Sequence, residues 1–217
     1  MPLAIFDLDN TLLQGDSDVE WGRFLVDQGH VDGEVYEREN ERFYEEYKAG
    51  TLDIIEFLAF SLKPLAEHDR QTLEAWRREF MATRIRPLIT PAAQALVEKH
   101  RQAGDTLMII TATNRFVTQP IAEHFDIPHL IATDPEEQDG RYTGRVAGTP
   151  CFREGKVTRI RVWLAEQGAD LDSSCFYSDS HNDLPLLEAV SYPHAVNPDD
   201  ELASTAKARG WPILDLS

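Results

Sequence analysis

Residues 3–11, LAIFDLDNT, constrain the fold more than any other stretch of this chain. An apolar run leads directly into Asp7 and Asp9, which are two residues apart. Such a short continuous run predicts a strand buried on both faces, as in the interior of a parallel sheet. Asp7 then lies at the carboxyl end of the strand, where open α/β sheets bind their ligands. Two buried carboxylates are costly unless a cation or a substrate engages them, so this strand end is a candidate active site.

The same pattern, an apolar run that ends in a polar residue, recurs twice later in the chain. Residues 106–111 end in Thr111, and residues 174–179 end in Asp179. Segments with helical spacing lie between these runs, and strands that alternate with helices predict an α/β fold with a doubly wound parallel sheet. The other expected elements are helices over 92–103, 116–125 and 184–187, one that opens at Gly155-Lys156 and one from Asp199 to about Arg209, strands over 129–133 and 194–197, and a hairpin at 141–146.

Residues 16–86 differ from the rest of the chain because they show no strand-like alternation. Their apolar residues recur at helical spacing, which predicts about four helices, and Thr51 is the expected cap of one of them. We therefore predict a core domain of residues 1–15 and 87–217 with an inserted all-helical domain of residues 16–86. The aromatic side chains of the insert are expected to form its own core rather than line a pocket; they include Trp21, Phe24, Phe43, Tyr44 and Tyr47.

The charge balance excludes several classes of partner. The chain has 21 lysines and arginines against 38 aspartates and glutamates, a net charge of −17. This charge argues against nucleic acid or an anionic membrane as the partner. The apolar runs are too short to cross a membrane, and no apolar leader precedes the first strand. Two cysteines are too few for a disulfide framework, so the cytoplasm is the expected location.

The polar strand ends suggest phosphoryl-transfer chemistry. Right-handed crossovers place the carboxyl ends of these strands along one edge of the sheet, where their polar side chains can converge. Mg²⁺ needs few protein ligands beside water and substrate phosphate, and the carboxylates of Asp7 and Asp179 are the first candidates. A carboxylate can also attack phosphorus and form an aspartyl-phosphate. Asp9 is then placed to protonate the leaving oxygen and to deprotonate the attacking water.

Later segments supply groups that can hold a phosphoryl group. Lys156, at a helix start, provides the fixed positive charge that the acidic chain otherwise lacks. Asp183 follows Asp179 by four residues and faces the same side if a helix begins there. The expected phosphate-binding groups are the Thr111 hydroxyl and nearby backbone amides. The remaining candidates for this role are Thr11, Ala112, Thr113 and Asn182.

Together these motifs resemble those of the haloacid dehalogenase superfamily of phosphohydrolases, and they occur in the same order along nearly the whole chain. The insert after the first motif is similar to the helical cap of the phosphoserine-phosphatase-like branch, and the residues around the first motif also resemble its histidinol-phosphatase-like members. The four motifs are Asp7-Leu8-Asp9-Asn10-Thr11, Thr111, Lys156, and Asp179 with Asp183.

This resemblance implies a Rossmann-like core with an inserted all-helical cap. It implies that Asp7 is the nucleophile and Asp9 the acid and base. It also implies Mg²⁺ held by Asp7, the Asp9 carbonyl and Asp179, with Asp183 a ligand through water. The expected activity is hydrolysis of a small phosphomonoester.

Two alternatives to hydrolysis remain open from the sequence. One is transfer of the phosphoryl group to a second substrate, as in mutases of the same superfamily. The other is a phosphate-binding protein with a vestigial site. The presence of Asp9 disfavours the second alternative, because turnover requires a proton carrier and binding does not.

Asp16 and His181 each allow two interpretations. In phosphoserine phosphatases an acid at the position of Asp16 meets the substrate's amine, so Asp16 predicts a leaving group with an amine or an imidazole. The same residue can instead simply cap the first helix of the insert. His181 lies beside a candidate site residue and is either a substrate contact or a solvent-facing loop residue.

Overall fold

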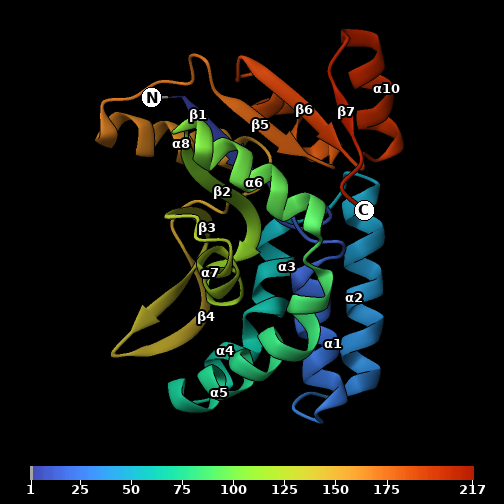
Figure 1. Cartoon of the computed structure of the whole chain (residues 1–217). Helices are drawn as coiled ribbons and strands as arrows, with labels where there is room; N and C mark the ends of the chain where they lie inside the picture. The colour runs from blue at the N-terminus through green and yellow to red at the C-terminus, as the bar shows by residue number, and fades with distance from the viewer. Residues whose placement is uncertain (1) are drawn as a thin grey trace.

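The computed structural model describes residues 2–217 and contains a seven-stranded sheet with the order β4-β3-β2-β1-β5-β6-β7. All neighbouring strands pair in parallel except β3 and β4, which are antiparallel. In Figure 1, strands β1, β5, β6 and β7 lie in the upper part, and the β3–β4 hairpin reaches down to the lower left. The strands are β1 (Leu3–Phe6), β2 (Thr106–Asn114), β3 (His129–Gln138), β4 (Arg141–Ala147), β5 (Cys175–Ser178), β6 (Tyr192–Val196) and β7 (Ile213–Leu214).

Strand β1 occupies the centre of the sheet between β2 and β5. All four of its residues are buried, which confirms the interpretation of the opening apolar run. Its alternate side chains enter two separate apolar clusters, with Ala4 and Phe6 in one and Leu3 and Ile5 in the other. A strand with both faces in apolar cores needs an apolar residue at every position, as this one has.

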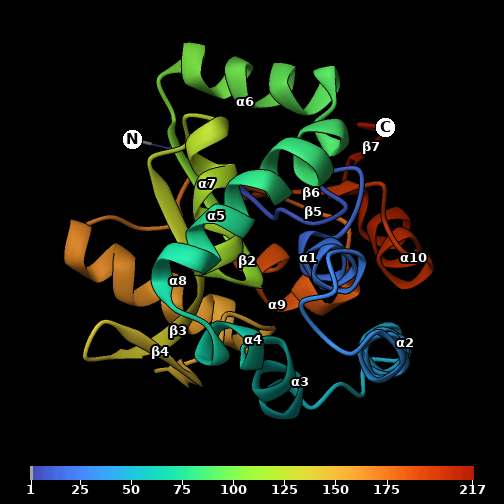
Figure 2. The ribbon, with the colours of Figure 1, turned by 90° about the horizontal axis from the view of Figure 1, so that it is seen from below.

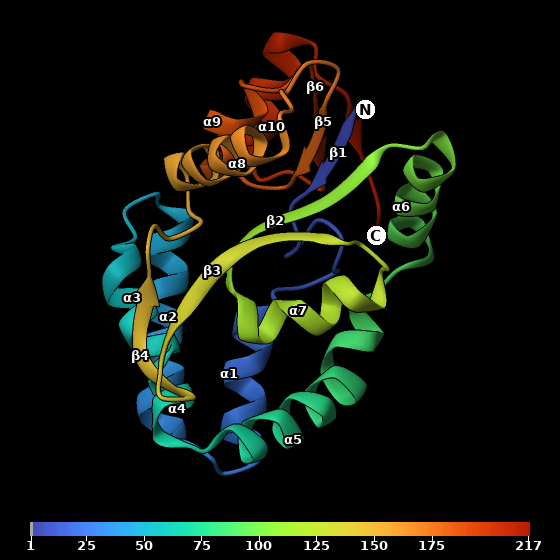
Figure 3. The same ribbon diagram turned by 90° about the vertical axis from the view of Figure 1, so that its left-hand side faces the viewer.

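Helices cover both faces of the sheet, which confirms the doubly wound α/β class. One face packs against α6 (Pro91–Ala103) and α7 (Arg115–His124). The opposite face packs against α8, α9 and α10, which Figure 3 shows together on the other side of the sheet. Their bounds are Glu154–Gln167, Leu184–Leu187 and Asp200–Arg209.

The segment between β1 and α6 is helical throughout its regular structure and forms the lower part of Figure 1. It has five α-helices rather than four, because a break before Pro64 separates two short ones. After the last α-helix, a π-helical turn (Met81–Ile85) and a 3₁₀ turn (Arg86–Leu88) lead back to the core. The five helices are α1 (Ser17–Asp27), α2 (Gly33–Lys48), α3 (Ile54–Ser61), α4 (Lys63–Glu67) and α5 (Arg70–Phe80).

We call this helical segment the cap. Figure 2 shows the molecule with the cap toward the viewer. The two connections between the cap and the core run side by side, because Leu13 and Ile89 form an antiparallel bridge. The expected capping role of Thr51 was wrong. Asp53 caps α3 instead, accepting the N–H groups of Ile55 and Glu56, since it directly precedes the helix.

Strand β3 extends five residues beyond the predicted 129–133 and continues into the hairpin with β4. The hairpin packs against the cap: Arg70 of α5 pairs with Glu137 at 2.8 Å, and the Arg70 guanidinium lies over the Tyr142 ring. Strand β7, only two residues long, was not predicted, because a two-residue strand has no detectable periodicity. Among residues 2–217, no helix combines the length and the apolar character needed to cross a bilayer.

Candidate active site

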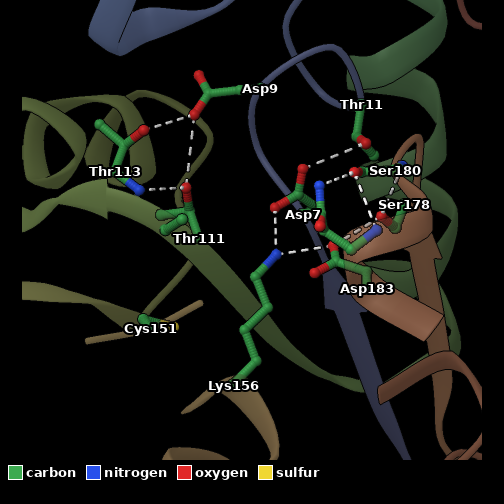
Figure 4. Close-up of polar contacts among 12 residues, drawn as sticks. Asp7, Asp9, Thr11, Thr111, Thr113, Cys151, Lys156, Ser178, Ser180 and Asp183 are labelled. Carbon is green, nitrogen blue, oxygen red and sulfur yellow. Dashed lines mark hydrogen bonds and ion pairs between the residues drawn. The ribbon is translucent and has the colours of Figure 1, made fainter. Parts of the chain in front are cut away.

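The carboxyl ends of the three central strands bring the predicted groups together (Figure 4). Asp7 follows β1 directly, and its N–H donates to the carbonyl of Tyr177 in β5 at 2.9 Å. Thr111 lies within β2 rather than at its end, since the strand continues to Asn114. The pairing of β2 with β3 is irregular between Ile110 and Asn114, which is the stretch that faces the site.

Lys156 forms the electrostatic centre of the site. It lies in the first turn of α8, is only 3% exposed, and its Nζ donates to Asp7 Oδ1 and Asp183 Oδ2, each at 2.7 Å. The Ser178 hydroxyl also donates to Asp183 Oδ2 at 2.7 Å. Burial opposes the charge of Lys156, but the carboxylates of Asp183 and Asp7 outweigh it and hold the pKa of Lys156 well above its ordinary value.

Asp7 and Asp179 share one hydroxyl group. Thr11 Oγ1 lies 3.5 Å from Asp7 Oδ2 and 3.1 Å from Asp179 Oδ1. Burial raises the pKa of Asp7 to about 7, against the attraction of Lys156 and with added repulsion from Asp183 and Asp9. Burial, together with repulsion from Asp7 and Asp183, also holds the pKa of Asp179 well above its ordinary value. Raised pKa values mean that the ionised forms of these buried carboxylates are disfavoured, and a cation beside them would favour those forms.

Asp7 and Asp179 supply carboxylate oxygens of the kind that Mg²⁺ binds. In the part of the chain that the structure describes, no three His, Cys, Asp or Glu residues lie close enough together to form a metal site by themselves. Mg²⁺ retains several waters and commonly binds through one or two carboxylates plus a substrate phosphate. Asp7 and Asp179 meet that requirement.

Asp9 is held between the core and the start of the cap. Its Oδ1 accepts the N–H of Ser17, the first residue of α1, at 2.6 Å. Its Oδ2 accepts the Thr113 hydroxyl at 2.8 Å and lies 3.5 Å from that of Thr111 (Figure 4). Burial and the neighbouring Asp16 raise the pKa of Asp9 to about 6, in spite of these hydrogen bonds. A carboxyl group with that pKa can both give and take a proton near neutral pH.

A cavity of about 90 Å³ lies between this sheet edge and the cap. Thr11 and Asp179 do not line it; they lie on the side of Asp7 where their side chains bond to each other. All the other predicted site residues line it: Asp7, Asp9, Asp16, Thr111, Ala112, Thr113, Lys156, Asn182 and Asp183.

The cap wall of the cavity is acidic and aromatic. Asp18 and Asn40 line it beside Asp16, and neither was singled out from the sequence. Burial raises the pKa of Asp18 well above its ordinary value, and Asp16 and Asp9 add repulsion. Within residues 2–217, Lys156 is the only cationic side chain in the lining. The remaining lining residues are Val19, Phe43, Tyr44, Tyr47, Leu52, Ile54 and Phe57 of the cap, Phe152 of the core, and Asn10 in the loop after β1.

The aromatic side chains of the cap therefore divide into two groups. Trp21 and Phe24 lie in the apolar core as expected, whereas Phe43, Tyr44 and Tyr47 line the cavity. The expectation that all of them serve only as core was wrong. Helical spacing shows that residues share a face of a helix, but it does not show whether that face meets another helix or a cavity.

The capping interpretation of Asp16 is confirmed, its contact with a leaving group stays a prediction, and His181 lies outside the cavity lining. Asp16 caps α1, since its Oδ1 accepts the N–H groups of Asp18 and Val19, yet the same side chain lines the cavity. Burial raises its pKa despite those bonds. His181 Nδ1 pairs with Asp199 Oδ2 at 2.8 Å outside the cavity lining.

The sequence matches a known protein family and several known proteins. A family model for haloacid dehalogenase-like hydrolases matches residues 4–188. The chain belongs to this family. Histidinol-phosphatase of Neisseria meningitidis serogroup C is 50% identical over 218 aligned residues, which cover 99% of this chain and 98% of that protein.

Solved structures agree with the fold of this haloacid dehalogenase-like hydrolase. A protein of unknown function from Bordetella pertussis Tohama I is 50% identical and superposes with a TM-score of 0.94, with 100% of this chain and 99% of that one covered. A phosphoserine phosphatase with an analogue of its phospho-aspartyl intermediate has a TM-score of 0.73 at 18% identity, covering 100% and 93%. At that identity the likeness supports the fold alone. The predicted family, fold class and phosphatase activity are thus confirmed.

Proposed function

We propose that this phosphatase hydrolyses a small phosphomonoester whose leaving group carries an amine or imidazole and no carboxylate, with Mg²⁺ as cofactor. The observation that carries the proposal is the composition of the cap wall. Asp16 and Asp18 face the cavity among aromatic rings, and no cation of the described chain lines that wall. Acidic groups in an apolar setting favour a cationic ligand and repel a carboxylate, which would be left unpaired.

The residues of the site support a two-step reaction. Asp7 attacks phosphorus and forms an aspartyl-phosphate, while Lys156 neutralises charge beside it at 2.7 Å. Asp9 protonates the leaving oxygen and then takes a proton from the water that hydrolyses the intermediate. Thr111 and Asn182 both line the cavity, and we assign the Thr111 hydroxyl and the Asn182 side-chain amide to the binding of phosphoryl oxygens.

Mg²⁺ would bind next to these catalytic residues. Asp7 and Asp179, with the Asp9 carbonyl and with Asp183 through water, would hold Mg²⁺. When bound, the ion supplies positive charge opposite the phosphoryl oxygens. The Thr11 hydroxyl lies between the carboxylates of Asp7 and Asp179 and would help to hold both in place.

The leaving group we infer is of the histidinol type. Histidinol-phosphatase of Neisseria meningitidis is 50% identical across nearly the full length of both chains. An amine and a protonated imidazole offer two cationic groups, and Asp16 and Asp18 offer two carboxylates. The rings of Phe43, Tyr44 and Tyr47 provide a wall against which an imidazole can pack.

A comparison of three substrates tests this proposal. We expect kcat/KM for histidinol phosphate to exceed that for phosphoserine by at least about 100-fold, because the phosphoserine carboxylate would meet Asp16 and Asp18 without a partner. p-Nitrophenyl phosphate, which has no charge on its leaving group, serves as the neutral reference. Equal values of kcat/KM for histidinol phosphate and phosphoserine would contradict the proposal.

The Asp18→Asn variant tests the contribution of Asp18 to binding of the leaving group. We expect the ratio of kcat/KM for histidinol phosphate to that for p-nitrophenyl phosphate to fall by about tenfold or more, the typical value of one charge-assisted contact. Glu34→Gln is the matched control, because Glu34 also lies in the first turn of a cap helix but is exposed. If the ratio of the two kcat/KM values is unchanged in Asp18→Asn, Asp18 does not contact the leaving group.

Removal of the metal gives a further expected result. Incubation with a chelator should abolish hydrolysis of p-nitrophenyl phosphate, and added Mg²⁺ should restore it, because Asp7 and Asp179 need a cation to bind a phosphate dianion beside them. Full activity in the presence of excess chelator would rule out the Mg²⁺ assignment.

Hydrolysis is favoured over the two alternatives and fits an enzyme of the cytoplasm. The contacts of Asp9 with Ser17 and Thr113 hold a proton carrier at the site, which a binding protein does not need. Incorporation of oxygen from labelled water into the released phosphate would separate hydrolysis from phosphotransfer. Cys151 and Cys175 are both free and buried, as is usual for thiols in a reducing compartment.

A further inference from the structure

Arg153 joins the cap to the cavity, although nothing in the sequence singled it out. It directly precedes α8, and its Nε donates to Asn182 Oδ1 at 2.8 Å. Its Nη2 donates to the carbonyl of Gly50, in the turn that follows α2. Figure 3 shows this turn beside the loop that leads into α8. One guanidinium thus bonds both a cap carbonyl and a side chain that lines the cavity.

The backbone at Arg153 is strained. Its φ of +50° and ψ of −121° lie in a region that residues other than glycine rarely adopt. The surrounding loop leaves little freedom to relax: a Cβ on Gly155 would lie 2.1 Å from the carbonyl oxygen of Pro150. Such strain is retained where the side chain it presents has a role.

On the cap side, the turn after α2 fits closely against the core. Gly50 has a φ of +69°, and a Cβ added there would lie 3.0 Å from Arg153 Nη2 and 3.4 Å from His181 Nε2. The Tyr47 hydroxyl donates to Ser180 Oγ at 3.0 Å, and the Asn182 Nδ2 group donates to the Tyr47 carbonyl at 3.4 Å. This end of the cap is therefore docked through polar contacts that require a set geometry.

We propose that Arg153 is a positioning residue: when the turn at Gly50 is docked, it fixes the Oδ1 end of the Asn182 side chain. It thereby sets where the Nδ2 group, which also contacts the Tyr47 carbonyl and Ser180 Oγ, meets the phosphate. A guanidinium has planar donors in a fixed arrangement, so it holds two acceptors in one relative orientation, which the rotatable donors of an ammonium do not fix. Loss of the cap contact frees the guanidinium and, with it, the Asn182 amide. Cap docking is thereby coupled to the phosphate site. This inference rests on the proposed phosphatase function for its readout.

The first test compares Arg153→Gly with Arg153→Lys. Glycine relieves the backbone strain, so we expect an unchanged or higher melting temperature together with a fall in kcat/KM for p-nitrophenyl phosphate of about tenfold or more. Lysine keeps the charge but not the two-acceptor geometry, so it should restore less than half of the lost activity. Full activity in Arg153→Gly, or full rescue by lysine, would overturn the proposal.

A double-mutant cycle with Asn182→Ala tests whether Arg153 acts through Asn182. If it does, Arg153→Gly should lower kcat/KM by less than about twofold in the Asn182→Ala background, because the group it orients is gone. Independent effects that multiply in the double variant would refute the coupling. If the wild-type protein hydrolyses no phosphomonoester at all, the proposed function fails; if it does so and the cycle is additive, only this inference fails.

Gly50→Ala tests the cap side, with Gly29→Ala as its matched control. Gly29 has a φ of +68°, close to that of Gly50, but no atom lies within 4 Å of a Cβ added there. Both variants should lose similar stability from the left-handed backbone. Only Gly50→Ala displaces the Arg153 guanidinium, so only it should lower kcat/KM, by about fivefold or more. Equal kcat/KM values for the two variants would show that docking of the cap does not affect the phosphate site, which would contradict the proposal.

Discussion

Asp7→Asn should abolish hydrolysis of every phosphomonoester, with kcat at least about 10⁴-fold below that of the wild type, because an amide cannot attack phosphorus. The change keeps the shape of the side chain, and Lys156 retains its ion pair with Asp183 at 2.7 Å. Stability should therefore change by no more than about 1 kcal/mol. Steady-state kinetics with p-nitrophenyl phosphate and thermal unfolding provide the two measurements.

Asp105→Asn is a suitable control for the Asp7 variant. Asp105 is another aspartate next to a sheet strand, but it directly precedes β2 and pairs with His100 at 2.7 Å, at the opposite end of β2 from the site. This variant should keep the active-site contacts of the wild type. Turnover above about 1% of the wild-type rate in Asp7→Asn would show that a different group is the nucleophile.

Lys156→Met should have the second largest effect, on stability as well as on activity. The Lys156 side chain is nearly fully buried, and its removal leaves the carboxylates of Asp7 and Asp183 without their shared cation. Removal of one partner from a buried ion pair typically costs about 3–5 kcal/mol. At this chain length, that loss corresponds to a fall in melting temperature of roughly 10 °C. kcat should fall at least about 10³-fold, since the phosphoryl charge loses its fixed counter-charge.

Lys99→Met is the matched control, because Lys99 is exposed on α6 and far from the site in the fold. It should change neither the melting temperature nor kcat measurably. Addition of Asp183→Asn to Lys156→Met should recover part of the lost stability, because one uncompensated carboxylate is then removed. A melting temperature of Lys156→Met equal to that of the wild type would mean that the buried charges are compensated in another way.

The sequence predicted the core fold well because its signals are local. The opening apolar run is buried on both faces, as its composition requires. Helix ends could also be predicted where a single residue determines them. Asp199 caps the start of α10, and Gly210 ends the helix with a φ of +70°. The prediction for Thr51 failed because Asp53, two residues later, competes for the same role and directly precedes the helix.

The sheet side and the cap side of the candidate site differ in how far the sequence alone could predict them. Asp7, Asp9 and Thr111 were found because each lies at or near the end of a buried strand. Asp18, Asn40 and the cavity-lining aromatic residues were not, because a cap helix shows the same periodicity whether it faces an apolar core or a cavity. A second acid two residues after Asp16 was the one available signal, and it resembles an ordinary first-turn acid.

By itself, then, the sequence determined which residues can carry the proposed chemistry: Asp7 and Asp9 follow a central strand, and Lys156 lies at the start of a helix. Strand order brings these segments together. The tertiary structure decided what surrounds that chemistry. The contact of Arg153 with Gly50 joins residues 103 positions apart, and that of Tyr47 with Ser180 joins residues 133 apart. Such contacts depend on how the cap packs against the core, and no local pattern of residues encodes that packing.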